Sequence, residues 1–196
     1  MSRIALFGTS ADPPTAAHQA IIRWLGEHYD RVAVWASDNP MKSHQTPLSH
    51  RMRMLRLLIT DIDSEVKNIK LHEELSNPRS LHTVRKAQEM WGKENEFTLV
   101  VGSDLIAQMP KWYQIAELLA QVKVLVVPRQ GYTIADEDLE EVRNLGGNCE
   151  IADFQAPPVS STAYREQGDT NIITQPVEDY IQQEHLYLCH NQAQTR

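Results

Sequence analysis

Two short stretches at opposite ends of the chain carry residue types that bind phosphate groups. Residues 7–18 read FGTSADPPTAAH, and residues 159–165 read VSSTAYR. Each stretch is predicted to be a loop that runs into a helix, and the free N–H groups and partial positive charge of a helix N-terminus attract anions. His18 and Arg165 add side-chain donors. Together the two stretches predict a site for a polyphosphate, which favours nucleotidyl transfer over simple binding.

Two common kinds of phosphate site are absent from the sequence. It contains neither the P-loop pattern Gly-x-x-x-x-Gly-Lys-Ser/Thr nor the dinucleotide pattern Gly-x-Gly-x-x-Gly. The chain is therefore not a P-loop NTPase, and it lacks the usual dinucleotide fingerprint. Its loops must bind phosphate in another way.

Strands and helices are expected to alternate along the whole chain. Apolar runs predict strands at residues 3–7, 32–36, 66–75, 97–101, 122–127 and 149–154. Helical spacing predicts helices at residues 15–29, 48–62, 80–91, 113–120, 135–145, 161–167 and 177–184. This alternation predicts an α/β fold with a doubly wound, mostly parallel sheet and helices on both faces, in one domain spanning residues 1–196. Such folds bind ligands outside the carboxyl ends of their strands, where the candidate groups lie.

Composition and charge argue against several other classes of protein. The chain has 196 residues and a formal net charge of −7, which argues against nonspecific binding to nucleic acids or anionic membranes. No apolar run approaches the roughly 20 residues that span a bilayer, and the first apolar run is too short for a signal peptide. Cys149 and Cys189 lie far apart, so neither a disulfide framework nor a zinc site is expected. A reducing, cytoplasmic location is expected.

The motifs, taken in order, resemble those of the nucleotidyltransferase superfamily. Residues 7–18 resemble its signature Gly-x-(Thr/Ser)-Phe-Asp-Pro-x-(His/Thr)-x-Gly-His, and residues 159–165 resemble Ser-(Ser/Thr)-Thr-x-x-Arg. Residues 101–104 with Trp112 resemble the Gly-x-Asp…Trp segment of the nicotinate- and nicotinamide-mononucleotide adenylyltransferase family. Further residues that match positions of the bacterial nicotinate enzymes are Pro40, Lys42, Arg51 and residues 128–132. The resemblance covers almost the whole chain.

This resemblance implies two sets of site residues. The ATP-binding set is Gly8, Ser10, Thr15, His18, Gly102, Asp104, Ser161, Thr162 and Arg165, with His18 and Arg165 as the catalytic residues. In this set, Gly8 lets the backbone approach the nucleotide closely and Asp104 accepts hydrogen bonds from the ribose hydroxyls. The substrate-binding set is Lys42, His82, Trp112 and Arg129. Lys42 and Arg129 are expected to hold the phosphate of a mononucleotide, and Trp112 offers a flat face to a pyridine ring.

The resemblance also implies a reaction, the transfer of an adenylyl group from ATP to nicotinate mononucleotide. The products are nicotinate adenine dinucleotide and pyrophosphate, in NAD biosynthesis. The attacking 5′-phosphate is already an anion, so positioning and charge stabilisation are enough without a general base. Mg²⁺ is expected to bridge phosphate oxygens with few protein ligands, so no residue is assigned as a metal ligand. No nucleic acid or membrane partner is expected, and a homo-oligomer stays open.

Some positions depart from the family pattern. Thr9 replaces a glycine, Ala11 replaces the usual Phe, and Ala17 replaces the glycine of the last tetrad, where a methyl group fits if φ is negative. Leu81 and His82 replace Tyr-Thr in a segment that recognises the ring substituent. Nicotinamide mononucleotide as the preferred or an equal substrate therefore stays open. Pantetheine-phosphate adenylyltransferase activity and a catalytically inactive nucleotide-binding module are less favoured interpretations of the same motifs.

Purely structural roles are alternatives for several of these residues. Ser161 and Thr162 are suited to capping a helix, and Asp104 is suited to capping the helix after it. Trp112 is suited to the core. Arg51 is expected to support the fold or to pair with a carboxylate.

Overall fold

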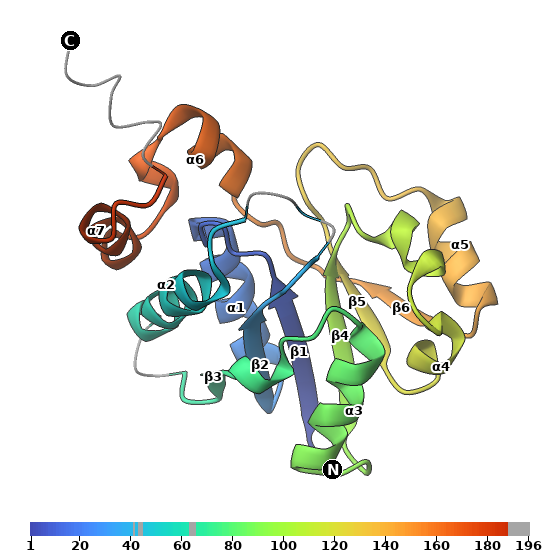
Figure 1. Ribbon diagram of the computed structural model, residues 1–196. Helices are drawn as coiled ribbons and strands as arrows, with labels where there is room; N and C mark the ends of the chain where they lie inside the picture. Colours follow the sequence, from blue (N-terminus) through green and yellow to red (C-terminus); the bar gives the residue numbers. More distant parts are fainter. Residues whose placement is uncertain (41, 43–44, 63–65, 188–196) are drawn as a thin grey trace.

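A six-stranded sheet, entirely parallel, forms the centre of the molecule. The computed structural model describes residues 1–40, 42, 45–62 and 66–187. The strands are β1 (Arg3–Thr9), β2 (Arg31–Ala36), β3 (Ile69–Leu71), β4 (Glu96–Gly102), β5 (Lys123–Val127) and β6 (Asn148–Ile151). Their order in the sheet is β3-β2-β1-β4-β5-β6, so the direction of winding reverses between β1 and β4 (Figure 1).

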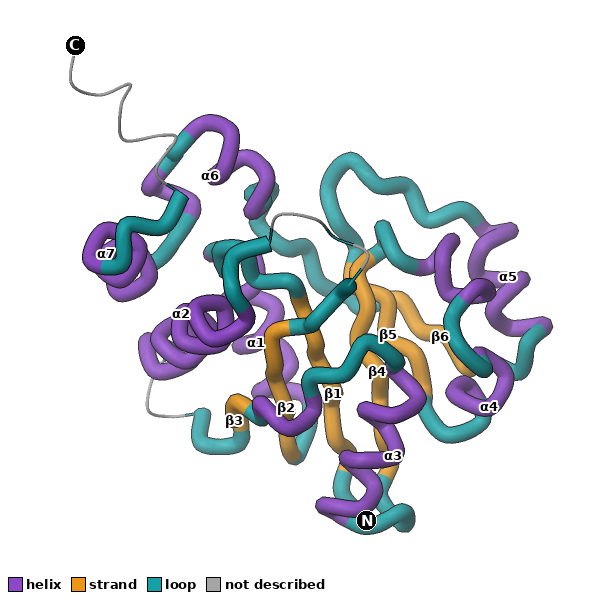
Figure 2. The backbone as a smooth tube through the Cα atoms, in the orientation of Figure 1, coloured by secondary structure: helices purple, strands orange, loops and turns teal. Residues whose placement is uncertain are grey.

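Helices cover both faces of this sheet (Figures 1 and 2). They are α1 (Ala16–His28), α2 (Leu48–Asp61), α3 (Ser80–Trp91), α4 (Ile115–Leu119), α5 (Asp136–Asn144), α6 (Ser161–Gln167) and α7 (Gln175–Gln183), with 3-10 turns η1 (Glu73–Leu75), η2 (Ile106–Lys111) and η3 (Thr170–Ile172). On one face α2 packs against α1 and α7, and on the other α3 packs against α4 while α5 contacts η2. The doubly wound α/β prediction is confirmed.

The central strands form the most buried part of the core. Residues 4–7 of β1 and 97–101 of β4 are all buried, because helices cover the sheet on both sides. Leu6 aligns with Ala33 of β2 on one side and with Leu99 of β4 on the other. These continuous apolar runs are typical of parallel strands that are buried on both faces. No helix within the described residues is long and apolar enough to cross a membrane.

The largest difference from the sequence prediction lies at the β3 edge. The sequence predicts a strand over residues 66–75, but only Ile69–Leu71 is extended and Glu73–Leu75 forms η1. The Asn68 side-chain amide donates to the carbonyls of Gly26 and Tyr29, 2.9 and 2.7 Å away, at the end of α1. Residue 68 is therefore anchored to a helix end, and the edge strand starts only after it.

Two loops at the carboxyl edge of the sheet are held together by a buried arginine of α2. Arg51 is 2% exposed, and its Nε donates to the Thr46 carbonyl at 2.8 Å. Its Nη1 donates to the carbonyls of Ser10 and Ser37, at 3.0 and 2.7 Å. Ser10 follows β1 and Ser37 follows β2, so one guanidinium joins the loops that leave two neighbouring strands. Arg51 therefore supports the fold.

Replacing Arg51 tests how far these loops depend on it. Arg51→Met keeps most of the side-chain volume but leaves three carbonyls without their donor, so we expect a loss of about 2–4 kcal/mol of unfolding free energy. Arg53→Met is the matched control, because Arg53 lies on the same helix and is exposed; it should change stability by less than about 0.5 kcal/mol. Urea denaturation measures both, and equal effects would contradict the role of Arg51.

Candidate active site

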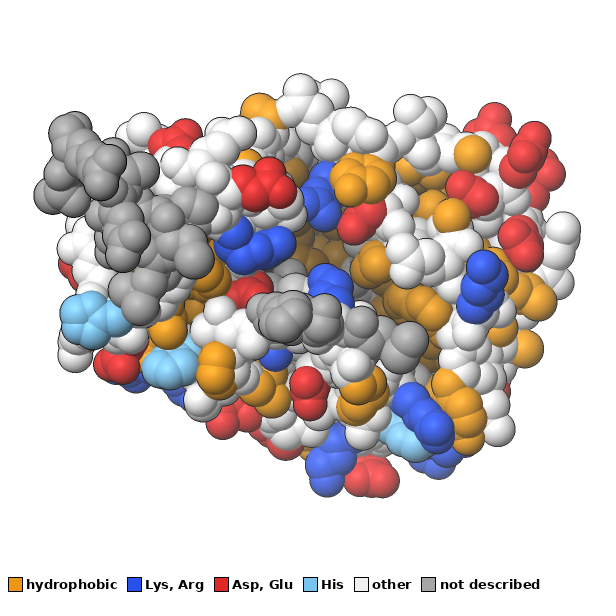
Figure 3. Space-filling model, turned by 45° about the horizontal axis from the view of Figure 1, so that its top comes forward, with side chains coloured by type: hydrophobic (Ala, Val, Ile, Leu, Met, Phe, Trp, Pro, Cys, Tyr) orange, Lys and Arg blue, Asp and Glu red, His pale blue; other side chains and the backbone are white. Residues whose placement is uncertain are grey.

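The predicted site residues lie mostly where the chain leaves the carboxyl ends of the strands. Gly8 and Gly102 lie at the carboxyl ends of strands β1 and β4, and Arg129 comes two residues after β5. This edge is at the top of Figure 1, and Figure 3 brings it forward. Figure 3 shows Lys and Arg side chains around a hollow on this face. A crevice at the point where the strand order reverses is the usual ligand site of an open α/β sheet.

The two stretches that the sequence predicts to bind phosphate come together in the structure. Arg165 Nη1 donates to the backbone carbonyl of Asp12 at 2.6 Å, across 153 residues of sequence. Ser161 Oγ donates to the carbonyl of Pro13, also at 2.6 Å. Two hydrogen bonds therefore attach the start of α6 to the loop between β1 and α1, as expected for two parts of one site.

The side chains at the start of α6 bond partly to the helix itself and partly to the loop between β1 and α1. Ser160 is the N-cap, and its Oγ accepts from the backbone N–H of Ala163 at 3.1 Å. The helix-capping alternative for Ser161 and Thr162 is therefore wrong. Because the Ser161 hydroxyl proton is given to Pro13, Ser161 can offer a phosphate only its backbone N–H. Arg165 Nη2 donates to Thr162 Oγ1 at 3.3 Å, which fixes the guanidinium beside the helix start.

The start of α1 fixes the protonation state of His18. Thr15 is the N-cap residue of α1, and its backbone N–H donates to His18 Nδ1 at 2.9 Å. A backbone N–H can only donate, so Nδ1 carries no proton and the neutral ring bears its proton on Nε2. Burial, and secondly the charge of Arg129, lower the pKa of His18 to about 4. At neutral pH the side chain is an uncharged Nε2–H donor.

Two residues of this loop that depart from the family pattern, Ala17 and Ala11, differ in how well they suit the backbone. Ala17 lies within the first turn of α1 and is not among the residues with positive φ, so the condition for its methyl group is met. Ala11 is buried and adopts a left-handed conformation, with φ of 48°. That conformation is uncommon for a residue other than glycine, and here it turns the chain directly before Asp12.

Packing in the sheet explains why position 8 is a glycine, which the sequence alone does not show. A Cβ at Gly8 would lie 2.5 Å from the indole of Trp35, on the neighbouring strand β2. The absence of a side chain therefore makes room for Trp35. The close approach of a nucleotide to Gly8 stays a prediction.

Asp104 and Arg129 are paired across the ends of β4 and β5. Arg129 Nη1 lies 3.2 Å from Asp104 Oδ2. The backbone N–H of Arg129 donates to Ser103 Oγ at 2.9 Å, which ties the two loops together. Asp104 is not the N-cap of η2, which begins after Leu105, so the capping alternative for Asp104 is wrong. The sequence predicts that the two side chains bind different parts of the ligands, and the structure shows them as partners of each other.

Lys42 reaches the first loop from the segment between β2 and α2. Its Nζ donates to Ser10 Oγ at 2.8 Å, and the side chain is exposed. Two predicted residues that are 32 positions apart are thus brought into contact. A phosphate could replace the Ser10 hydroxyl as the acceptor, because the ammonium group carries three donors.

His82 contacts Tyr113, the residue that follows Trp112 in the chain. The His82 ring meets Tyr113 edge-on with 5.6 Å between ring centroids, and Arg79 lies 4.1 Å above the same Tyr113 ring. Trp112 is partly buried and packs against the core, which supports the structural alternative for this residue. Leu81 is fully buried, and of the two substituted positions only His82 can therefore reach a ligand.

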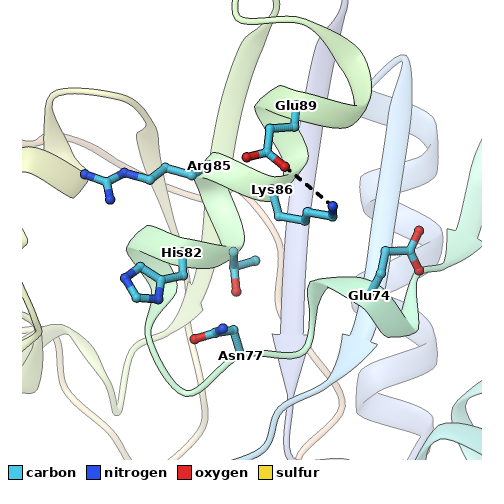
Figure 4. Close-up of a pocket in the computed structure, with 7 residues that line it drawn as sticks. Glu74, Asn77, His82, Arg85, Lys86 and Glu89 are labelled. Carbon is cyan, nitrogen blue, oxygen red and sulfur yellow. Dashed lines mark hydrogen bonds and ion pairs between the residues drawn. The ribbon is translucent and has the colours of Figure 1, made fainter.

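His82 also lines a surface cavity of about 320 Å³ beside α3. Figure 4 shows its ring next to Asn77, with Arg85 directed away from Lys86 and Glu89. Lys86 and Glu89 pair at 3.5 Å, and Arg85 pairs with Glu117 of α4. Most of the charges around this cavity are therefore already partnered. Among the described residues no group of three His, Cys, Asp or Glu side chains could hold a metal ion.

Asp12 and Tyr187 organise the site, although the sequence predicts no role for either residue. Asp12 lies inside the first motif, but only the structure shows that its backbone and side chain bind three separate segments. Tyr187 lies 175 positions away and its hydroxyl donates to the Asp12 carboxylate. No spacing or composition signal in the sequence points to that contact.

The titration of His18 tests the electrostatics of the site. We expect its imidazole to titrate at about 4, well below the ordinary 6.5, in an NMR pH series. Arg129→Ala should raise this midpoint, because it removes a nearby positive charge, but leave it below 6.5 because burial is the larger cause. Arg143→Ala, which removes a charge on α5, is the control. A wild-type midpoint near 6.5 would show that the ring is neither buried nor held by Thr15.

Comparison with known proteins identifies the family. The chain matches the cytidylyltransferase-like family over residues 6–167. It is 46% identical to the probable nicotinate-nucleotide adenylyltransferase of Synechocystis sp., over 94% of this chain and 98% of that protein. The corresponding protein of Aliarcobacter butzleri is 29% identical, over 91% of this chain and 94% of its own length.

A solved structure shares the fold. The nicotinic acid mononucleotide adenylyltransferase of Plasmodium falciparum, in complex with NaAD, matches with a TM-score of 0.80 and 19% identity, over 95% of this chain and 98% of that one. The doubly wound architecture is therefore the Rossmann-like nucleotidyltransferase fold. The chain belongs to the cytidylyltransferase-like family of nucleotidyltransferases, in the branch that holds these nicotinate-nucleotide adenylyltransferases.

Proposed function

We propose that this chain transfers the adenylyl group of ATP to the 5′-phosphate of nicotinate mononucleotide and releases pyrophosphate. The observation that carries the proposal is the junction of two phosphate-binding stretches, made by Arg165 with Asp12 and by Ser161 with Pro13. The relatives that are 46% and 29% identical are both named probable nicotinate-nucleotide adenylyltransferases, which supports this substrate.

The proposed reaction relies on hydrogen-bond donors that surround the phosphate groups of the substrates. An oxygen of the mononucleotide's 5′-phosphate forms a bond to the α-phosphorus of ATP, and the bond from that phosphorus to the pyrophosphate breaks. Because the attacking phosphate is already an anion, no proton must be removed from it. The neutral Nε2–H of His18 donates to a phosphate oxygen. The remaining N–H groups of Arg165 stabilise charge that builds up on the leaving pyrophosphate. Rate enhancement then comes from positioning and charge stabilisation.

ATP is proposed to enter as its Mg²⁺ complex. The described residues offer no three-ligand cluster for a metal, so the phosphate oxygens of the nucleotide would supply most of the coordination. Bound in this way, the ion would neutralise phosphate charge. The protein's part is to hold the ATP phosphates with His18 and Arg165, and the phosphate of the mononucleotide with Lys42 and Arg129.

The ring end of the acceptor is proposed to lie near His82, Tyr113 and Trp112. Arg79 lies 4.1 Å above Tyr113, so this region carries a permanent positive charge. A nicotinate carboxylate is attracted by such a charge, and the uncharged carboxamide of nicotinamide mononucleotide is not. This argument favours nicotinate mononucleotide over nicotinamide mononucleotide.

Pyrophosphate release decides between the candidate acceptors. With Mg-ATP and the purified protein, we expect the highest kcat/KM with nicotinate mononucleotide, a lower value with nicotinamide mononucleotide and none with phosphopantetheine. A preference for nicotinamide mononucleotide would keep the mechanism and contradict the role of Arg79. ATP binding without pyrophosphate release from any acceptor would instead identify a catalytically inactive nucleotide-binding module.

Replacing His18 tests its catalytic role. His18→Ala removes the Nε2–H donor, and losing one such donor at a phosphate should lower kcat by about a hundredfold or more. His28→Ala is the matched control, because His28 lies at the other end of the same helix, where it stacks on Trp24 at 3.9 Å. The control should keep its turnover. A His18→Ala variant with near-normal kcat and an unchanged melting temperature would remove His18 from the mechanism.

A further inference from the structure

Asp12 is the residue at which three distant parts of the chain meet the phosphate-binding loop. Its side chain is buried, at 5% exposure. One carboxylate oxygen, Oδ2, accepts the backbone N–H of Thr46 at 3.2 Å, and the other, Oδ1, accepts the hydroxyl of Tyr187. Its backbone carbonyl accepts from Arg165. Asp12 thus joins the segment before α2, the last turn of α6 and residue 187 after α7.

Tyr187 packs against α6 in this position. It follows α7, and its backbone adopts a left-handed conformation with φ of 57°. Its ring meets Tyr164 of α6 edge-on, with 5.9 Å between centroids and 85° between planes. The Tyr164 hydroxyl in turn donates to Glu178 of α7 at 3.2 Å. Two helices therefore fix the ring that presents the hydroxyl to Asp12.

The Tyr187 hydroxyl keeps its proton throughout the working pH range. Burial, and then the hydrogen bond to Asp12, raise the pKa of Tyr187 far above its ordinary value. A buried carboxylate needs donors at both oxygens, because an unpaired charged oxygen carries the full cost of desolvation. Tyr187 is the side chain that supplies the donor at Oδ1.

We propose that Tyr187 is a positioning residue for the ATP site, acting through Asp12. The loop that Asp12 anchors carries Ser10 on one side and leads into Thr15 and His18 on the other. Fixing the carboxylate therefore fixes the groups that face the ATP phosphates. Residues 184–187 after α7 thus form part of the frame of the ATP site, with Tyr187 acting through Asp12 and not through the phosphates themselves. This inference rests on the proposed function.

The Tyr187→Phe variant tests the proposal. It removes only the hydroxyl and keeps the ring on Tyr164, so the fold should persist. Loss of a hydrogen bond to a charged group should weaken ATP binding about tenfold, measured by calorimetry. The KM for the mononucleotide should change less than about twofold, because its proposed contacts lie elsewhere. Amide hydrogen exchange in residues 10–18 should become faster in the variant.

Tyr180→Phe is the matched control. The Tyr180 hydroxyl also joins the C-terminal part to α2, by bonding His50 Nδ1 at 2.8 Å, but it does not contact Asp12. The control should leave both ATP affinity and exchange in residues 10–18 unchanged. Equal effects of the two variants would mean that Tyr187 acts only by stabilising the fold, and would overturn the proposal. So would a Tyr187→Phe variant with wild-type affinity and exchange.

A double-mutant cycle with Asp12→Asn tests whether Tyr187 acts through Asp12. Tyr187→Phe should weaken ATP binding less in the Asp12→Asn background than in the wild type, since the charged acceptor is already gone. Additive effects would overturn the proposal. Binding and exchange are measured without turnover, so a wild-type protein that binds ATP but releases no pyrophosphate would contradict the proposed function alone.

Discussion

The site depends on two backbone carbonyls, those of Asp12 and Pro13, each of which accepts a 2.6 Å hydrogen bond from α6. These bonds bring the starts of α1 and α6 to one place, where the polyphosphate site is proposed. The helix α6 has only seven residues and lies far along the chain from the first loop. The two bonds fix its start against that loop at one end of the sheet. They also use the Ser161 hydroxyl and one Arg165 N–H for architecture, which leaves backbone amides and the other guanidinium donors for a ligand.

The electrostatics of this edge differ from those of the whole chain. The net charge is −7, yet Lys42, Arg51, Arg129 and Arg165 all lie near the ends of the central strands. Arg51 is buried and bonded to neutral carbonyls, so its charge contributes to the potential of the crevice. The lowered pKa of His18 has burial and the charge of Arg129 as its causes. A field that disfavours a second positive charge on His18 is one that attracts phosphate.

Sequence alone predicted the features that depend on local pattern. Helices at residues 80–91 and 161–167 have the predicted bounds, and the central strands differ by one or two residues, because apolar periodicity and caps are local signals. Contacts between distant residues carried no such signal. The packing of Trp35 over Gly8 and the bond from Tyr187 to Asp12 depend on strand pairing and on the path of the chain after α7. The short β3 likewise depends on the bonds of Asn68 to the end of α1.

The polar contacts of the site fall into two physical classes, and the division explains how it can bind ligands without refolding. The pairs of Lys42 with Ser10 and of Arg129 with Asp104 are exposed, and such contacts contribute little net free energy, so a phosphate or a ribose hydroxyl can replace one partner at small cost. The bonds of Arg51 and of Asp12 are buried, and breaking them leaves unsatisfied polar groups. Ligand binding should therefore exchange the first class and leave the second intact. A frame that stays fixed while its exposed donors change partners is what transition-state stabilisation by preorganised charge requires.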